Sequence, residues 1–73
     1  MSRLKIITSA QMCRLIKNLG FKAIRQKGSH KFYKHDDGRT TVIPMHAEDL
    51  DRSLIRKMLM DIDITIDEYN DLV

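Results

Sequence analysis

The most constraining feature of the sequence is a block of three short β-forming runs between two helical segments. The runs are predicted at residues 21–26, 29–35 and 40–43. Lys27-Gly28 marks the first turn or bend, and residues 36–39 are a hairpin signal because Gly38 accepts the positive φ of such turns. Connections this short join antiparallel neighbours. Pro44 ends regular pairing because it has no N–H to donate.

The first helical segment precedes these runs. A helix is predicted over residues 9–19, because Thr8 and Gln11 resemble a capping box and Gly20 is a natural C-terminal stop. Its apolar face carries Met12, Leu15, Ile16 and Leu19. This spacing is typical of a helix that packs one face on a core.

The second helical segment follows the β-forming block. It begins between residues 49 and 53, where either Asp51 or Ser53 can act as the N-cap. One face carries Leu50, Leu54, Ile55, Met58, Leu59 and Ile62. A second capping-box pattern at residues 65–68 predicts a further helix of one or two turns that includes Tyr69 and Leu72.

The order of the elements predicts an α+β protein. A helix, three antiparallel strands and a helix fold as an α-β-β-β-α sandwich, in which both helices cover one face of the sheet and leave the other open. This is the order of double-stranded-RNA-binding domains, here followed by a short C-terminal helix. With 73 residues, the chain is predicted to form a single domain over residues 1–73.

Charge is distributed unevenly along the chain. Residues 1–46 carry ten Lys or Arg and two Asp, a net charge of +8. Residues 47–73 carry three basic and eight acidic residues, a net charge of −5. The basic part predicts a polyanionic partner, and the alternative is a solvated surface without a ligand.

A single cysteine excludes a disulfide-stapled secreted scaffold. Cys13 lies near the apolar side of the first helix and is expected to be a core thiol. The chain has no signal-peptide-like segment and no apolar stretch of about 18 residues that could span a bilayer. We therefore expect a cytoplasmic protein with no membrane partner.

His30 is the strongest candidate for catalysis. It follows Gly28-Ser29, where glycine lets the backbone bend and another molecule approach closely. Three lysines surround it in sequence: Lys27, Lys31 and Lys34. Imidazole exchanges protons near neutral pH, and RNA supplies its own nucleophile, the 2′-OH. A histidine in a basic patch can therefore start RNA cleavage without a metal; the alternative is a histidine that only hydrogen-bonds at a strand edge.

Strand alternation leaves the direction of His30 open. It groups residues on two faces: His30, Phe32 and Lys34 on one, and Ser29, Lys31, Tyr33 and His35 on the other. If Phe32 faces the core, His30 points inward too, unless a glycine-induced bulge resets the alternation. One of Phe32 and Tyr33 belongs to the core, and the other is a candidate for stacking on bases.

The two other histidines have structural interpretations. His35 lies beside the 36–39 turn and is expected to be exposed to solvent. His46 follows Pro44 and is either a second acid–base group or, the favoured interpretation, a residue that holds a turn. The histidines have no cysteine cluster and no ligand-like pairing with acids, so no metal site and no cofactor are predicted.

Several motifs in a specific order cover nearly the whole chain, from about residue 8 to residue 72. They are Leu19-Gly20-Phe21, the run Arg25 to His30, Asp37-Gly38, Val42-Ile43-Pro44-Met45-His46, the helix with Leu54, Met58 and Leu59, and residues 64–69. In this order they resemble the HicA (YcfA-like) toxin family. Ala47, Arg52 and Asp61 depart from it, because each stands where glycine is usual or common in the family.

The resemblance implies a double-stranded-RNA-binding-domain-like toxin of a type II toxin–antitoxin system. Such a toxin is a ribosome-independent mRNA interferase, and its catalytic histidine in Gly-Ser-His falls on His30. The implied partners are mRNA and a HicB-type antitoxin that masks His30 and the basic face. The implied setting is the cytoplasm of a bacterial, archaeal or phage host.

These observations together define the expected site. His30 is the expected catalytic residue, and no metal or cofactor is involved. The expected RNA contacts are Arg25, Lys27, Gly28, Ser29, Lys31 and Lys34, with His46 and Tyr33 as accessory residues. Two alternatives stay open: a double-stranded-RNA-binding module without chemistry, and a purely regulatory partner of another protein.

Overall fold

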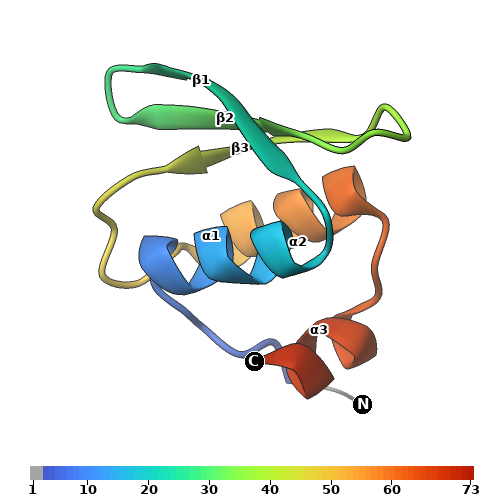
Figure 1. Cartoon of the computed structure of the whole chain (residues 1–73). Helices are drawn as coiled ribbons and strands as arrows, with labels where there is room; N and C mark the ends of the chain where they lie inside the picture. The colour runs from blue at the N-terminus through green and yellow to red at the C-terminus, as the bar shows by residue number, and fades with distance from the viewer. Residues whose placement is uncertain (1–2) are drawn as a thin grey trace.

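A three-stranded antiparallel sheet lies over two helices, and a short third helix lies on the far side of those helices (Figure 1). The computed structural model describes residues 3–73. Its elements are α1 (Ser9–Asn18), β1 (Lys22–Lys27), β2 (His30–Lys34), β3 (Thr40–Pro44), α2 (Arg52–Ile62) and α3 (Ile66–Leu72). The strand order is β1-β2-β3, with β2 in the centre. This arrangement confirms the predicted α+β fold of the double-stranded-RNA-binding-domain type.

The first helix begins where the sequence predicts. The Thr8 hydroxyl accepts a hydrogen bond from the Gln11 N–H at 3.1 Å, and the Gln11 side chain accepts one from the Thr8 N–H at 2.9 Å. The capping box is therefore confirmed. The helix ends at Asn18, one residue earlier than predicted, because Leu19 is already the C-cap.

Of the two N-caps that the sequence left open for α2, Asp51 is the one observed. Its carboxylate accepts hydrogen bonds from the backbone N–H of Ser53 at 3.2 Å and from the Ser53 hydroxyl at 2.5 Å. The hydrogen bond from the Ser53 hydroxyl is the main cause of the lowered pKa of Asp51. The predicted capping box of α3 is also present, and the backbone N–H of Thr65 and Glu68 each donate to the other residue's side chain.

The strand ends differ from the prediction by one residue, except at the start of β3, which is Thr40 as predicted. β1 covers Lys22–Lys27 rather than residues 21–26, because Phe21 is only 2% exposed and enters the core before the strand begins. β2 is shorter than residues 29–35 by one residue at each end. β3 includes Pro44, which an edge strand tolerates because no neighbour on its outer side needs an N–H. Pairing continues past it, since the Met45 N–H donates to Ser29 O at 2.6 Å.

The core lies between the sheet and the helices. Its buried members are Leu4, Ile7, Met12, Cys13, Leu15, Ile16, Phe21, Tyr33, Ile43, Leu50, Ile55, Met58, Leu59, Ile62 and Tyr69. Cys13 is 8% exposed, as predicted for a core thiol. Within residues 3–73, no helix has both the length and the apolar character needed to cross a membrane.

Asp61, one of the three departures from the family pattern, has a structural role in this chain. Its carboxylate accepts a hydrogen bond from the buried Thr41 hydroxyl at 3.2 Å and pairs with Lys57 at 3.2 Å. Asp61 therefore connects α2 to β3, and the helix continues to Ile62.

Two fully buried tyrosines differ in how their hydroxyl groups are satisfied. The Tyr69 hydroxyl donates to Lys5 O at 2.6 Å and fastens the N-terminal segment to α3. The Tyr33 hydroxyl, by contrast, makes no hydrogen bond of normal geometry with any of the described residues 3–73. Burial raises the pKa of both groups, and the neighbouring Cys13 thiol contributes at Tyr33.

Phenylalanine substitutions at these two positions should therefore act in opposite directions. Tyr33→Phe removes a buried, unpaired hydroxyl, and we expect the free energy of unfolding to stay level or rise by up to about 1 kcal/mol. Tyr69→Phe removes a hydrogen bond and leaves Lys5 O without its donor, so it should lower that free energy by about 1 kcal/mol. Urea denaturation of both variants measures the difference. Equal losses would contradict this account of the Tyr33 hydroxyl.

Candidate active site

The turn between β1 and β2 is a two-residue hairpin loop. Lys27 and His30 are cross-strand partners, so Gly28 and Ser29 alone connect the strands. Gly28 has φ +58°, whereas Ser29 is not among the described residues with positive φ. Positive φ at only the first loop position is typical of a type II′ turn, which favours glycine there. The turn places His30 at the first position of β2.

His30 points away from the core. Tyr33 is fully buried under the helices, whereas Phe32 is only partly buried. Since neighbouring strand residues face opposite ways, His30, Phe32 and Lys34 lie on the sheet face that the helices leave open. Their β3 partners are Pro44, Val42 and Thr40. The packing of Tyr33 thus decides the question that alternation alone left open.

The register of the hairpin places two basic residues of β1 on the same face. The register passes from Ala23 opposite Tyr33 to Arg25 opposite Phe32, so Ile24 is an extra residue in β1. Cross-strand partners project from the same face. Counted from the turn, where Lys27 is opposite His30, regular pairing already puts Arg25 opposite Phe32, so Arg25 lies beside Phe32 and Lys27 beside His30. The bulge comes beyond both and changes only the faces of the strand residues that precede it in the sequence, Lys22 and Ala23.

The open face is basic and hollowed next to His30. The three strands, all within residues 3–73, contain no Asp or Glu. A shallow hollow of about 580 Å³ lies at the hairpin end of the sheet and is lined by Lys27, Gly28, Ser29, His30, Phe32 and Val42. The imidazole is exposed to solvent there. The site therefore offers a proton-exchanging group, a flanking cation and room for a ligand.

The structure gathers most of the residues predicted for RNA contact, but not all. Arg25, Lys27, Gly28 and Ser29 lie beside His30, and Lys34 lies further along the same face. Lys31 lies on the helix side instead, opposite Ile43, with its Nζ 5.8 Å from the centre of the Tyr33 ring. Tyr33 itself is fully buried, which leaves Phe32 as the aromatic residue of the open face.

His46 lies in the loop after β3, near the hairpin that carries His30. It is exposed and has φ +70°, a left-handed conformation that histidine adopts more readily than most residues. The backbone N–H of its neighbour Met45 donates a hydrogen bond to Ser29 O. The structure thus brings the His46 segment next to the hairpin and shows it in the turn conformation that the sequence interpretation favoured.

Ser9 is a supporting residue that the sequence analysis did not identify. Its hydroxyl donates to Pro44 O and accepts a hydrogen bond from the Ala47 N–H at 3.0 Å. The Ser9 N–H donates in turn to Ala47 O at 3.0 Å. These bonds anchor both ends of the His46 loop to α1. A serine at the start of a helix carries no signal for such long-range contacts.

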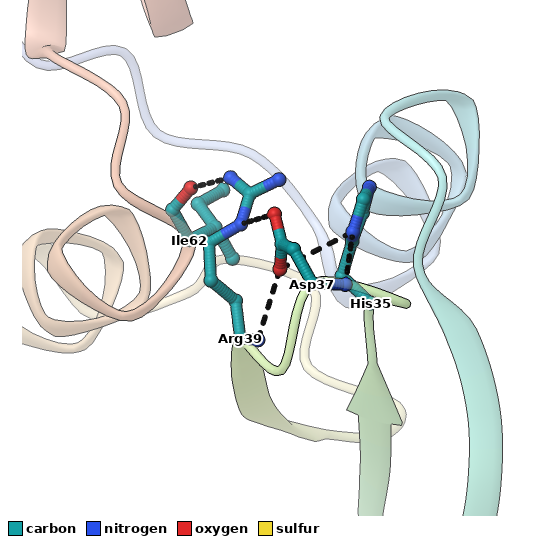
Figure 2. Close-up of polar contacts among 4 residues, drawn as sticks. All are labelled: His35, Asp37, Arg39 and Ile62. Atoms are coloured by element: carbon teal, nitrogen blue, oxygen red, sulfur yellow. Dashed lines mark hydrogen bonds and ion pairs between the residues drawn. The ribbon is translucent and has the colours of Figure 1, made fainter.

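His35 organises the turn between β2 and β3, at the other end of the sheet from His30. Figure 2 shows its Nδ1 facing Asp37, whose N–H lies 3.1 Å away. Asp37 also accepts hydrogen bonds from the Arg39 N–H at 3.0 Å and Nε at 2.8 Å, and the backbone one is the main cause that lowers the pKa of Asp37. Arg39 donates onward to Ile62 O.

The His35 ring also packs edge-on against Phe21, with centroids 5.1 Å apart. The sequence predicts an exposed His35, but the side chain is only 24% exposed. It belongs to this turn cluster rather than to the hollow around His30. Within residues 3–73, no group of three or more His, Cys, Asp or Glu side chains is positioned to hold a metal ion.

A comparison with protein families adds one finding. The family described as the HicA toxin of bacterial toxin–antitoxin systems matches residues 9–64. The matched region begins at the first residue of α1 and extends beyond α2, so it contains the hairpin, His30 and the whole sheet. No curated protein matches the chain.

Proposed function

Since this chain belongs to the HicA toxin family of bacterial toxin–antitoxin systems, we propose that it is a metal-independent endoribonuclease that cuts mRNA with His30. The family membership implies an antitoxin partner. The observation that carries the nuclease proposal is the exposed His30 imidazole, on the open basic face and beside Lys27 and a hollow. An mRNA substrate places the proposed activity in the cytoplasm.

The proposed reaction uses the nucleophile that RNA itself carries. The 2′-oxygen attacks the adjacent phosphorus, the bond from phosphorus to the 5′-oxygen breaks, and the products are a 2′,3′-cyclic phosphate and a 5′-hydroxyl end. His30 takes the proton from the 2′-OH or supplies the proton to the departing 5′-oxygen, and water provides for the other proton transfer. Lys27, Arg25 and Lys34 neutralise phosphates on the same face.

The antitoxin is proposed to be of the HicB type and to cover this face. An acidic, hydrogen-bonding surface would match the cations around His30 and would exclude RNA from the hollow. Binding at this face would silence the toxin without any change in its fold.

The chemistry is tested with a long RNA and purified protein in excess EDTA. We expect cleavage and 2′,3′-cyclic phosphate ends, while a 2′-deoxy oligonucleotide of matching sequence stays intact because it lacks the nucleophile. RNA that is bound but not cut would favour the alternative of a double-stranded-RNA-binding module, which the fold also fits. Cleavage of the 2′-deoxy strand would contradict the proposed reaction.

A further inference from the structure

Arg25 and Phe32 form a stacked pair on the open face, next to His30. They are cross-strand partners, and the Arg25 Cζ lies 4.4 Å from the centre of the Phe32 ring. Phe32 also lines the hollow that contains His30. Phe32 and His30 lie on the same face of β2, two residues apart, which is about 7 Å along a strand. One nucleotide of extended RNA can span this separation.

A second arginine–phenylalanine pair in the protein shows what a purely structural pair looks like. The Arg39 guanidinium lies 5.2 Å from the centre of the Phe21 ring. Its donors are used by the Asp37 carboxylate and by Ile62 O, and its side chain is 31% exposed. It holds the 36–39 turn against α2.

Arg25 has the same stacking contact but none of these partners. It is exposed, and no carboxylate or carbonyl group within residues 3–73 accepts a hydrogen bond from its guanidinium. The contact holds the guanidinium over the Phe32 ring and leaves its N–H groups without partners among residues 3–73. A planar fork held in place beside an aromatic ring is suited to a flat ligand with two acceptors on one edge.

Among the RNA bases, guanine presents such an edge. Its O6 and N7 are adjacent acceptors that arginine binds with two hydrogen bonds, whereas adenine carries an amino donor in place of O6. An unpaired base also stacks on phenylalanine or on a guanidinium plane. In an RNA duplex this edge lies in the deep, narrow major groove, which side chains do not reach.

Resting on the proposed nuclease function, we propose that Arg25 and Phe32 form a base-recognition subsite that holds an unpaired guanine beside the phosphate on which His30 acts. Phe32 supplies the stacking surface and Arg25 reads O6 and N7. The enzyme thereby prefers single-stranded RNA with a guanine next to the cleaved bond.

The test uses short single-stranded oligonucleotides of A and U with one central guanine, adenine or 7-deazaguanine. We expect kcat/KM for the guanine substrate to exceed that for adenine about tenfold or more, and 7-deazaguanine to lose most of this preference. Arg25→Lys keeps the charge but loses the planar fork, so its guanine-to-adenine ratio should approach one. Lys34→Ala is the matched control, because it weakens all substrates together and leaves the ratio unchanged.

Binding measured by fluorescence anisotropy with the His30→Ala protein separates this proposal from the nuclease proposal. The subsite is supported if the His30→Ala protein binds the guanine oligonucleotide more tightly than the adenine one and the double variant His30→Ala/Arg25→Lys does not. This result would hold even if the wild-type protein cuts no RNA. Equal affinity and equal cleavage for guanine and adenine would overturn the subsite while the nuclease stands. A preference that persists in Arg25→Lys, or faster cleavage of the annealed duplex, would overturn it as well.

Discussion

His30→Ala should greatly slow RNA cleavage while leaving the fold intact. We expect kcat to fall by a factor of about 10² to 10⁴, the usual contribution of a positioned proton-transfer group. The imidazole is exposed at the first position of β2 and makes no side-chain hydrogen bond within residues 3–73. The free energy of unfolding should therefore change by less than about 0.5 kcal/mol. Initial cleavage rates and urea denaturation measure the two effects.

Two other histidines provide the controls for this result. His35→Ala should lower stability, because the ring contacts Phe21 and the 36–39 turn, but should leave the cleavage rate of the folded protein close to that of wild type. His46→Ala tests the nearest other imidazole. Full activity in His30→Ala together with loss of activity in His46→Ala would transfer the catalytic role to His46.

Gly20→Ala should destabilise the protein more than any other glycine-to-alanine change. Gly20 has φ +98°, a conformation that costs a residue with a Cβ about 1–2 kcal/mol. A Cβ there would also lie 2.8 Å from His35 Nε2. The ring cannot move away without losing its contact with Phe21 and its hydrogen bond at Asp37. We expect a total loss of about 3 kcal/mol, a large share of the stability of a small domain.

Gly38→Ala is the matched control, because Gly38 has φ +99° and a Cβ there would meet nothing within 4 Å. It should cost only the backbone strain, about 1–2 kcal/mol. The comparison is repeated in a His35→Ala background, where the space beside Gly20 is open and the two losses should become equal. If Gly20→Ala and Gly38→Ala are equally destabilising with His35 present, the contact with His35 has no energetic weight.

The helix ends and turns were predictable because their signals are local. A capping box such as Thr8 with Gln11 satisfies donors within one turn, so four residues of sequence contain the whole interaction. The hairpin turns depend on Gly28 and Gly38 in the same way, since positive φ is a property of single residues. Strand ends were less predictable, because Phe21 enters the core and Pro44 occupies an edge only in the assembled sheet.

Contacts between residues that lie far apart in the sequence could not be predicted in the same way. His35 was expected at the surface from its place beside a polar turn, but its burial depends on Phe21, which is fourteen positions earlier in the chain. Ser9 is another case, since its bonds to Pro44 and Ala47 bridge residues more than thirty positions away. Local composition contains no trace of such partners.

Local signals in the sequence were enough to predict the order of the elements, the position of the hairpin turns and the Gly-Ser-His motif with its family resemblance. The direction of His30 and the cations around it depend instead on how the strands and helices pack together. Phe32 and Tyr33 are both aromatic and similar in size, so alternation fitted either face until Tyr33 packed against the helices. The register set by the two-residue turn then placed Lys27 beside His30 and Arg25 beside Phe32 on the open face, because register is a property of two paired strands and not of either sequence alone.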